Sequence, residues 1–141
     1  MKKIFMLATF LFAVMISSTA LAASWTPIDV GEKDSKVFVD KSTIKRGIQS
    51  KHYNFSRADG FSAVIRIDIN MSDTETISLI NLVGFFEENG KNKYIMLEAL
   101  DENGALAPDD KQLTQVEPEN ADGTGGTIWP KVYDFVQKNL P

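Results

Sequence analysis

The chain contains no cysteine and a single histidine, His52, among its 141 residues. Without thiols it can form neither a disulfide nor a thiolate site for zinc or an iron–sulfur cluster. One histidine is also too few for a multi-histidine metal centre. We therefore expect a fold that is stabilised by packing alone, with no cofactor and no bound metal.

Basic residues are fewer than acidic ones. Lysine and arginine number 15 against 19 aspartate and glutamate residues, which gives a formal net charge of −4 at pH 7. No basic cluster interrupts this acidic character along the sequence. Because an acidic surface repels nucleic-acid phosphates and anionic lipid headgroups, we expect no nucleic-acid partner.

The N-terminal segment, residues 1–22, has the three parts of a secretory signal peptide. Lys2 and Lys3 precede an apolar run, residues 4–16, which leads to an Ala-Leu-Ala sequence ending at Ala22. We expect export by the Sec route and cleavage after Ala22, with cleavage one residue later as the alternative. The run is shorter than the roughly 20 residues that span a bilayer, and no cysteine follows it for lipidation. We therefore expect no membrane anchor in the mature protein.

The chain that remains after this cleavage, residues 23–141, is long enough for one hydrophobic core but not for two. We expect a single small domain, located in the periplasm or secreted. Because cleavage removes Lys2 and Lys3, this domain is more acidic than the full chain.

Alternation of apolar and polar residues predicts a mostly β domain. The clearest alternation runs from Phe61 to Met71, where every second side chain is apolar, as in a half-buried strand. Further candidate strands are residues 25–30, 36–40, 48–55, 76–86, 93–100 and the short piece 111–116. Turns are predicted at 31–35, 58–60, 88–90 and 101–104, a helical turn at 41–44, and a bulge at Gly84.

A helix is predicted at the C-terminal end, over residues 127–136. Apolar side chains recur there at the i, i+3, i+4, i+7 spacing: Trp129, Val132, Tyr133 and Val136. Thr127 is expected to cap this helix. Strands followed by one terminal helix indicate the α+β class, with an antiparallel sheet of about six strands and a C-terminal α-helix packed on one face.

Few residues in the sequence indicate chemistry. His52 is the one general-base candidate near neutral pH, but no nucleophile motif accompanies it, which favours a surface histidine. The acidic residues at 101–104, Asp109 and Asp110 lack the twelve-residue calcium loop, which favours a tight turn. Residues 123–127 precede the helix without Walker or Rossmann spacing, which favours a flexible entry over an anion site.

The remaining candidates also have simpler interpretations. Asn54 and Asn70 begin glycosylation sequons, which we attribute to chance because the signal has a bacterial form. Trp129 and Tyr133 can stack on a ligand, but their spacing places them on the buried stripe of the helix. No pair of acids has a spacing that indicates a glycosidase. We therefore predict no catalytic, cofactor-binding or metal-binding residues, and a protein that is not an enzyme.

Several short motifs follow one another in an order that a known family shares. They are Trp25-Thr-Pro-Ile28, Val37-Phe-Val-Asp40, Ser42-Thr-Ile44, and the segments 78–86, 93–97, 101–104 and 127–136. This pattern resembles the surface-adhesin protein E-like family of bacterial exported domains. The founding adhesin of that family is a lipoprotein that binds host matrix and serum proteins. The resemblance therefore implies a host or envelope protein as the partner.

Two departures separate the chain from that family. Its members typically carry one cysteine at the end of the central strand and another near the C-terminus, whereas the stretches around Asn89 and Gln137 have none. This pattern fits loss of the whole bridge. Residues 48–60 also look like additional chain, and the lipidated cysteine of the adhesin is missing. The adhesive function therefore does not transfer directly.

Three hypotheses for the function remain open at this point. The leading one is a non-enzymatic exported binding domain or envelope-associated domain. The second is a periplasmic hydrolase that uses carboxylates, which predicts a concave site with two acids about 5 to 10 Å apart. The third is a purely structural or inhibitor-like domain without a small-molecule site.

Overall fold

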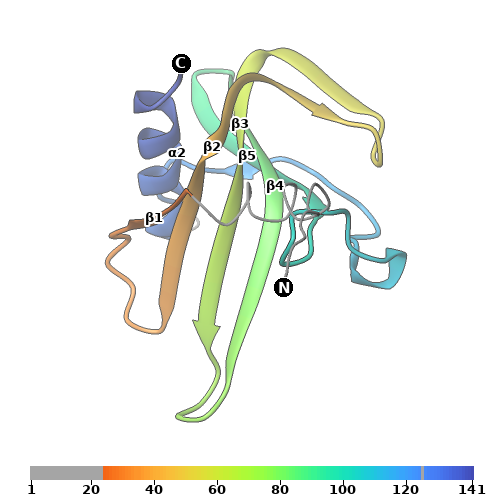
Figure 1. The fold of residues 1–141 in the computed structure, drawn as a ribbon. Helices are drawn as coiled ribbons and strands as arrows, with labels where there is room; N and C mark the ends of the chain where they lie inside the picture. Colours follow the sequence, from red (N-terminus) through yellow and green to blue (C-terminus); the bar gives the residue numbers. More distant parts are fainter. Residues whose placement is uncertain (1–23, 125) are drawn as a thin grey trace, which may run out of the picture.

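A computed structural model describes residues 24–124 and 126–141, which form a β-sheet and one α-helix (Figure 1). The predicted signal peptide lies outside the described residues. The strands are β1 Trp25–Ile28, β2 Ser35–Ser50, β3 Phe55–Asn70, β4 Thr76–Glu88, β5 Lys91–Ala99 and β6 Glu119–Asn120. A short 3-10 turn, η1 (Asp109–Lys111), precedes β6, and the helix α2 covers Ile128–Lys138.

The six strands follow one another in the sheet in the order in which they occur along the chain. Each strand pairs antiparallel with the next. The β4–β5 hairpin turns at Asn89 and Gly90, whose φ angles of 54° and 76° are those that a two-residue turn requires. The α2 helix lies across one face of the sheet (Figure 1). The predicted fold class is therefore confirmed.

The main core lies between α2 and this face of the sheet. Alternate residues of β3 point toward the helix, so that Phe61, Ala63 and Ile65 are buried. The Tyr133 ring of α2 meets the Phe61 ring edge-on, with 5.1 Å between the centroids. Trp129, predicted to be buried, is only half-buried and stacks on Tyr94 of β5, at 4.0 Å between centroids.

The start of α2 differs from the prediction in one respect. Thr127 does not cap the helix through its side chain. Its hydroxyl is instead directed to the β1–β2 connection, where it lies 3.1 Å from the carbonyl oxygen of Val30 and 2.9 Å from the carboxylate of Glu32. The residue therefore fastens the helix to the sheet rather than satisfying the helix's own amides.

The helical turn predicted at residues 41–44 is wrong, because β2 continues through this segment with a bulge. The register shifts here between Asp40 and Lys45. The buried Asp40 carboxylate accepts hydrogen bonds from the amide and hydroxyl of Ser42, at 3.0 and 2.6 Å. The Thr43 hydroxyl donates to the Asp40 carbonyl oxygen and accepts from the Val64 amide. These side chains replace the missing ladder bonds, so the strand bends without ending.

The turn predicted at residues 58–60 is also wrong. The β2–β3 hairpin turns at residues 51–54, where Asn54 adopts a left-handed conformation with φ 53°. Residues 58–60 belong to β3, at a second shift of register. The predicted strand at 111–116 is absent from the described structure, since Gln112 bonds through its side chain to Ala99 and Ala107 rather than through a ladder.

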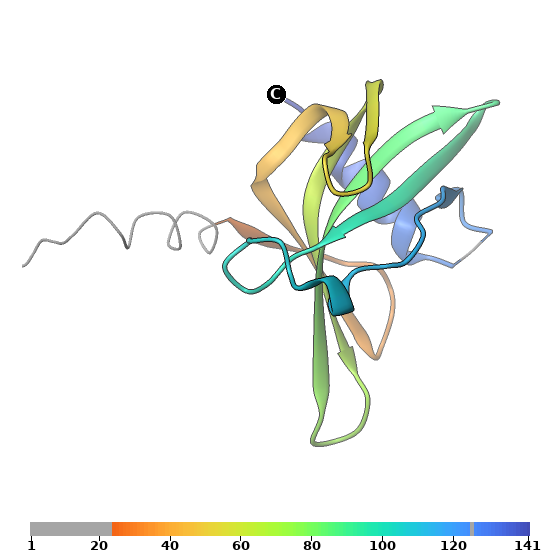
Figure 2. The same cartoon turned by 90° about the vertical axis from the view of Figure 1, so that its right-hand side faces the viewer.

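The two shifts of register bring the far half of the β2–β3 hairpin over the second face of the sheet (Figure 2). Ile48 packs there against Gly60 and Gly84. A Cβ atom at Gly84 would lie 2.7 Å from Cγ2 of Ile48, and one at Gly60 would lie 2.6 Å from the carbonyl oxygen of Phe85. Gly84 pairs in regular register with Ser62, so it marks this close contact rather than the predicted bulge.

A double-mutant cycle tests this contact. Gly84→Ala should lower the free energy of unfolding by about 1 to 3 kcal/mol, because the new methyl group overlaps Ile48. Ile48→Ala alone should cost about 2 to 5 kcal/mol. In the double variant, measured by urea unfolding, the Gly84→Ala change should add much less than it costs alone. Strictly additive costs would contradict the contact.

Candidate binding site

The β3–β4 hairpin projects beyond the rest of the sheet in both views (Figures 1 and 2). On its β5 side, the pairing of β4 begins only at Asn81, which lies opposite Ala99. One further bond joins the Leu100 amide to the Ile80 carbonyl oxygen, at 2.8 Å. Within the described part of the chain, no strand pairs with residues 76–79 on that side. We refer to these residues as the open edge of β4.

The open edge carries apolar side chains that the helix does not cover. Ile77 and Leu79 lie on the same face as the main core, opposite Ile69 and Ile67, yet both are exposed. Met71, just beyond the end of β3, is exposed as well. The predicted burial of alternate residues over 61–71 is therefore confirmed only for the part that faces α2. Exposed apolar side chains that lie close together on a surface are typical of an interaction site.

A groove of about 520 Å³ begins at the open edge. It lies between β4 and the chain that follows β5, and its apolar lining includes Leu79, Ile80, Met96, Leu100 and Leu113. We refer to it as the β4 groove. Two acids, Asp101 and Glu102, and one base, Lys111, also line it. Preformed ligand sites are commonly of this kind, mostly apolar with a few polar groups.

Side-chain hydrogen bonds hold the outer wall of the β4 groove in place. The Gln112 amide donates to the carbonyl oxygens of Ala99 and Ala107, at 2.8 and 2.9 Å, and accepts from the Ala99 amide at 2.8 Å. The Tyr53 hydroxyl donates to the carbonyl oxygen of Leu113. Burial raises the pKa of the Tyr53 phenol despite this hydrogen bond, so the donor stays protonated at neutral pH. The wall is therefore preformed.

A buried amide lies in the same groove. Asn81 is only 8% exposed and lines the cavity, but its side chain makes no hydrogen bond with any described residue. An unsatisfied buried polar group costs about 1 to 3 kcal/mol. A ligand that offers a donor or an acceptor at this position would bond to Asn81, which adds a buried polar contact to a mostly apolar lining.

One of the two acids of the β4 groove, Asp101, is bonded to the backbone of its own turn. The Asp101 carboxylate accepts hydrogen bonds from the amides of Asn103 and Ala105, at 2.8 and 3.0 Å, and so stabilises the turn that was predicted at 101–104. Glu102 is exposed on the same turn. Residues 101–104 therefore form the tight turn that the sequence favoured for this acidic stretch.

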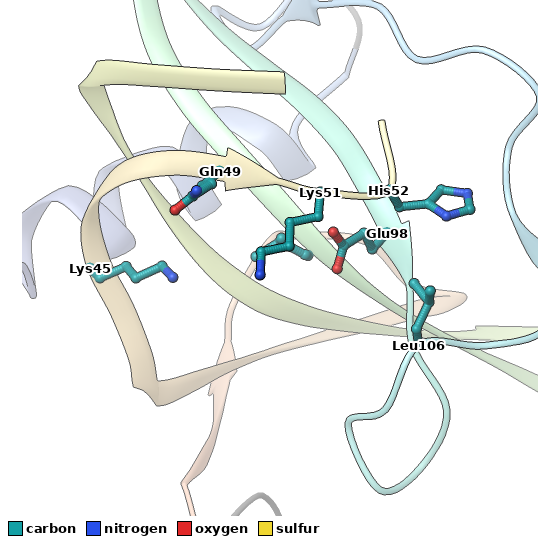
Figure 3. A pocket seen from close by; sticks show the side chains of 7 residues that line it. Lys45, Gln49, Lys51, His52, Glu98 and Leu106 are labelled. Carbon is teal, nitrogen blue, oxygen red and sulfur yellow. The ribbon is translucent and has the colours of Figure 1, made fainter. Parts of the chain in front are cut away.

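His52 lies in a second, more polar cleft of about 570 Å³ (Figure 3). Lys45, Gln49 and Lys51 of the folded hairpin line it, opposite Glu98 of β5. The Ser50 hydroxyl donates to the Glu98 carboxylate at 2.7 Å, whereas the His52 ring is directed away from that carboxylate in Figure 3. His52 instead meets the Tyr53 ring edge-on, with 4.6 Å between centroids. This geometry agrees with a surface histidine.

Tyr133, Asn54 and Asn70, also considered from the sequence, line neither of these two cavities. Tyr133 is buried in the main core, as its spacing predicted. Asn54 is in the β2–β3 turn and Asn70 is at the end of β3. Ahead of α2, the Asp122 carboxylate accepts hydrogen bonds from the amide and hydroxyl of Thr124. The amide and hydroxyl of Thr124 thus already have an intramolecular acceptor.

The β4 groove is not evident from the sequence. The only signal in the sequence was the uncharged run 76–86, and periodicity cannot divide this run into a buried part and an exposed part.

Comparison with known proteins gives no match to a family model, to a curated protein or to a solved structure. Residues 24–124 and 126–141 bring together no group of three acids or histidines that could hold a metal ion. None of the helices formed by these residues has the length and apolar character to cross a membrane.

An acid on β3, Asp68, is hydrogen-bonded to the open edge through Ser78. Burial opposes ionisation of Asp68, but hydrogen bonds from Arg66 and Ser78 outweigh it and hold the pKa of this carboxyl below its ordinary value of 3.8. Because the folded-state pKa is the lower one, the carboxylate contributes stability above pH 3.8, which is lost as the pH falls through the folded-state pKa.

Replacement of this acid should therefore have a pH-dependent effect. Asp68→Asn should lower the free energy of unfolding near neutral pH, and the difference from the wild type should shrink as the pH falls below 3.8. Urea unfolding across this range measures it. Asp73→Asn, in the exposed β3–β4 turn, is the control and should show little effect. A loss for Asp68→Asn that does not change with pH would contradict the assignment.

Proposed function

We propose that the protein is an exported, non-enzymatic binding or envelope-associated domain whose partner occupies the β4 groove. The observation that carries this proposal is the groove itself. It is preformed and mostly apolar, and it is lined by Asn81, whose amide makes no hydrogen bond with the described part of the chain. This amide is therefore available to a polar group of a ligand.

Two features of the sequence support the same function. The layout of residues 1–22 favours export, and the resemblance to the surface-adhesin protein E-like family favours a host or envelope protein as the partner. Exposed apolar residues near the groove, among them Ile77 and Leu79, favour a macromolecular partner over a small molecule. The acids at the groove give no specific support to the carboxylate hydrolase, since Asp101 is bonded to the backbone of its own turn.

Two exposed leucines of one loop provide a matched test of binding. Leu113, 47% exposed, lines the β4 groove, whereas Leu106, 48% exposed, lines the His52 cleft. Envelope and extracellular-matrix proteins captured by the wild type should be lost with Leu113→Gln and retained with Leu106→Gln. Both substitutions alter an exposed side chain, so stability should change by only about 0.5 kcal/mol. Equal capture by the two variants would exclude the groove as the binding site.

Export has a separate test. Mass spectrometry of the protein purified from its native host should give an N-terminus at Ala23 or Ser24, since the signal peptidase cuts after small residues. The substitution Leu11→Arg, inside the apolar run, should leave the protein unprocessed because the charge interrupts that run. Retention of Met1 in the wild-type protein would contradict export.

A further inference from the structure

We propose that the partner is an extended, basic peptide segment that adds to the open edge of β4 as a further strand and places an apolar side chain in the β4 groove. This rests on the proposed function and specifies how the groove is used. In this proposal the backbone of β4 pairs with the peptide, the apolar lining of the groove holds one of its side chains, and Asp101 and Glu102 attract its positive charge.

The backbone of β4 is oriented to accept such a strand. In an antiparallel sheet, the N–H and C=O groups of alternate residues point to the same edge. The carbonyl oxygen of Ile80 points toward the β5 side, where it accepts from Leu100. The backbone groups of Ser78 and Thr76 therefore point to that side as well, where the described structure offers them no strand. An added strand would continue the sheet at the place where β5 leaves it.

Nothing in the composition of this edge protects it. Native edge strands are commonly blocked by lysine, proline or a bulge, yet residues 76–80 carry no charge and no proline. The pairing of this segment with β3 is also regular, from Thr76 opposite Asn70 to Ile80 opposite Arg66. A regular, uncharged edge is the form that strand-adding recognition domains offer to their peptides.

The groove supplies specificity for a side chain of the added strand. It begins at Ser78 and Leu79, so a strand at the open edge lies directly beside it. Successive side chains of a strand alternate between its two faces, which lets one apolar side chain enter between Leu79 and Leu113. The Asn81 amide lies in the same cavity and can bond to a polar group of the peptide.

Charge favours a basic peptide over a second copy of this chain. Asp101 and Glu102 outnumber Lys111 at the groove, and the whole chain has a net charge of −4. Asp73 and Glu75 lie in the turn next to the open edge. Two copies paired through these edges would bring like charges together, whereas lysine or arginine in a peptide would meet opposite charge.

Three synthetic peptides test the proposal on the processed protein. The first alternates leucine and lysine, the second replaces lysine by glutamate, and the third is the first with alternate backbone amides methylated. The first should bind at least about 10-fold more tightly than either of the others, measured by fluorescence anisotropy, because only it has both the charge and the donors that a strand needs. Hydrogen exchange of the Ser78 amide should slow at least about 10-fold in that complex.

Variants of the edge complete the test. Ser78→Pro removes the outward N–H group and should abolish binding of the first peptide, whereas Ser78→Ala keeps the N–H group and should bind it. The hydrogen-exchange result on the wild type stands even if Ser78→Pro fails to fold. Equal binding of the methylated peptide, lost with Leu113→Gln, would overturn strand addition but leave the groove as the binding site. Self-association that Ser78→Pro removes, without peptide binding, would show a second copy at the edge and overturn the proposal.

Discussion

The placement of Ile48 over Gly60 and Gly84 is the contact on which both cavities depend. The absence of Cβ atoms at these two glycines lets the far half of the β2–β3 hairpin lie against the second face of the sheet. A second buried cluster forms there, in which Ile48 joins Phe86, Ile95 and Leu97. The same fold-over carries Tyr53 to the carbonyl oxygen of Leu113 and Ser50 to the carboxylate of Glu98. One wall of the β4 groove and one wall of the His52 cleft are therefore positioned by this contact.

Local signals in the sequence were sufficient for the fold class. The alternation that begins at Phe61 predicts a strand, the Asn89-Gly90 pair predicts the β4–β5 turn, and the stripe through Val132 and Val136 predicts the helix. Each of these patterns depends only on residues within about one turn or one strand length. The structure contains all three elements, and the antiparallel order follows because short turns join neighbouring strands.

The features that shape the site depend on contacts between distant residues. Lys41 to Ile44 continue a strand because the hydroxyl of Thr43 bonds to the amide of Val64, which no local pattern reveals. Gly84 suggested a bulge, but its role is to admit Ile48 from another strand. Periodicity assigned Met71 to the core face of a strand, but this residue lies just beyond the end of β3 and is exposed. Sequence patterns thus assign a residue to a face, whereas burial depends on what covers that face.

An open, uncharged strand edge is ordinarily a risk of aggregation, so its retention beside a preformed groove requires a reason. In this chain the protection against self-pairing lies next to the edge rather than within it. The acids Asp73 and Glu75 in the adjoining turn, together with Asp101 and Glu102 at the groove, repel a second copy of the same acidic chain. They leave the backbone groups of Thr76 and Ser78 available to a strand of opposite charge. For the proposed recognition of a basic segment, these acids would oppose pairing of two copies, while the hydrogen-bonding groups of the edge would stay available to the peptide.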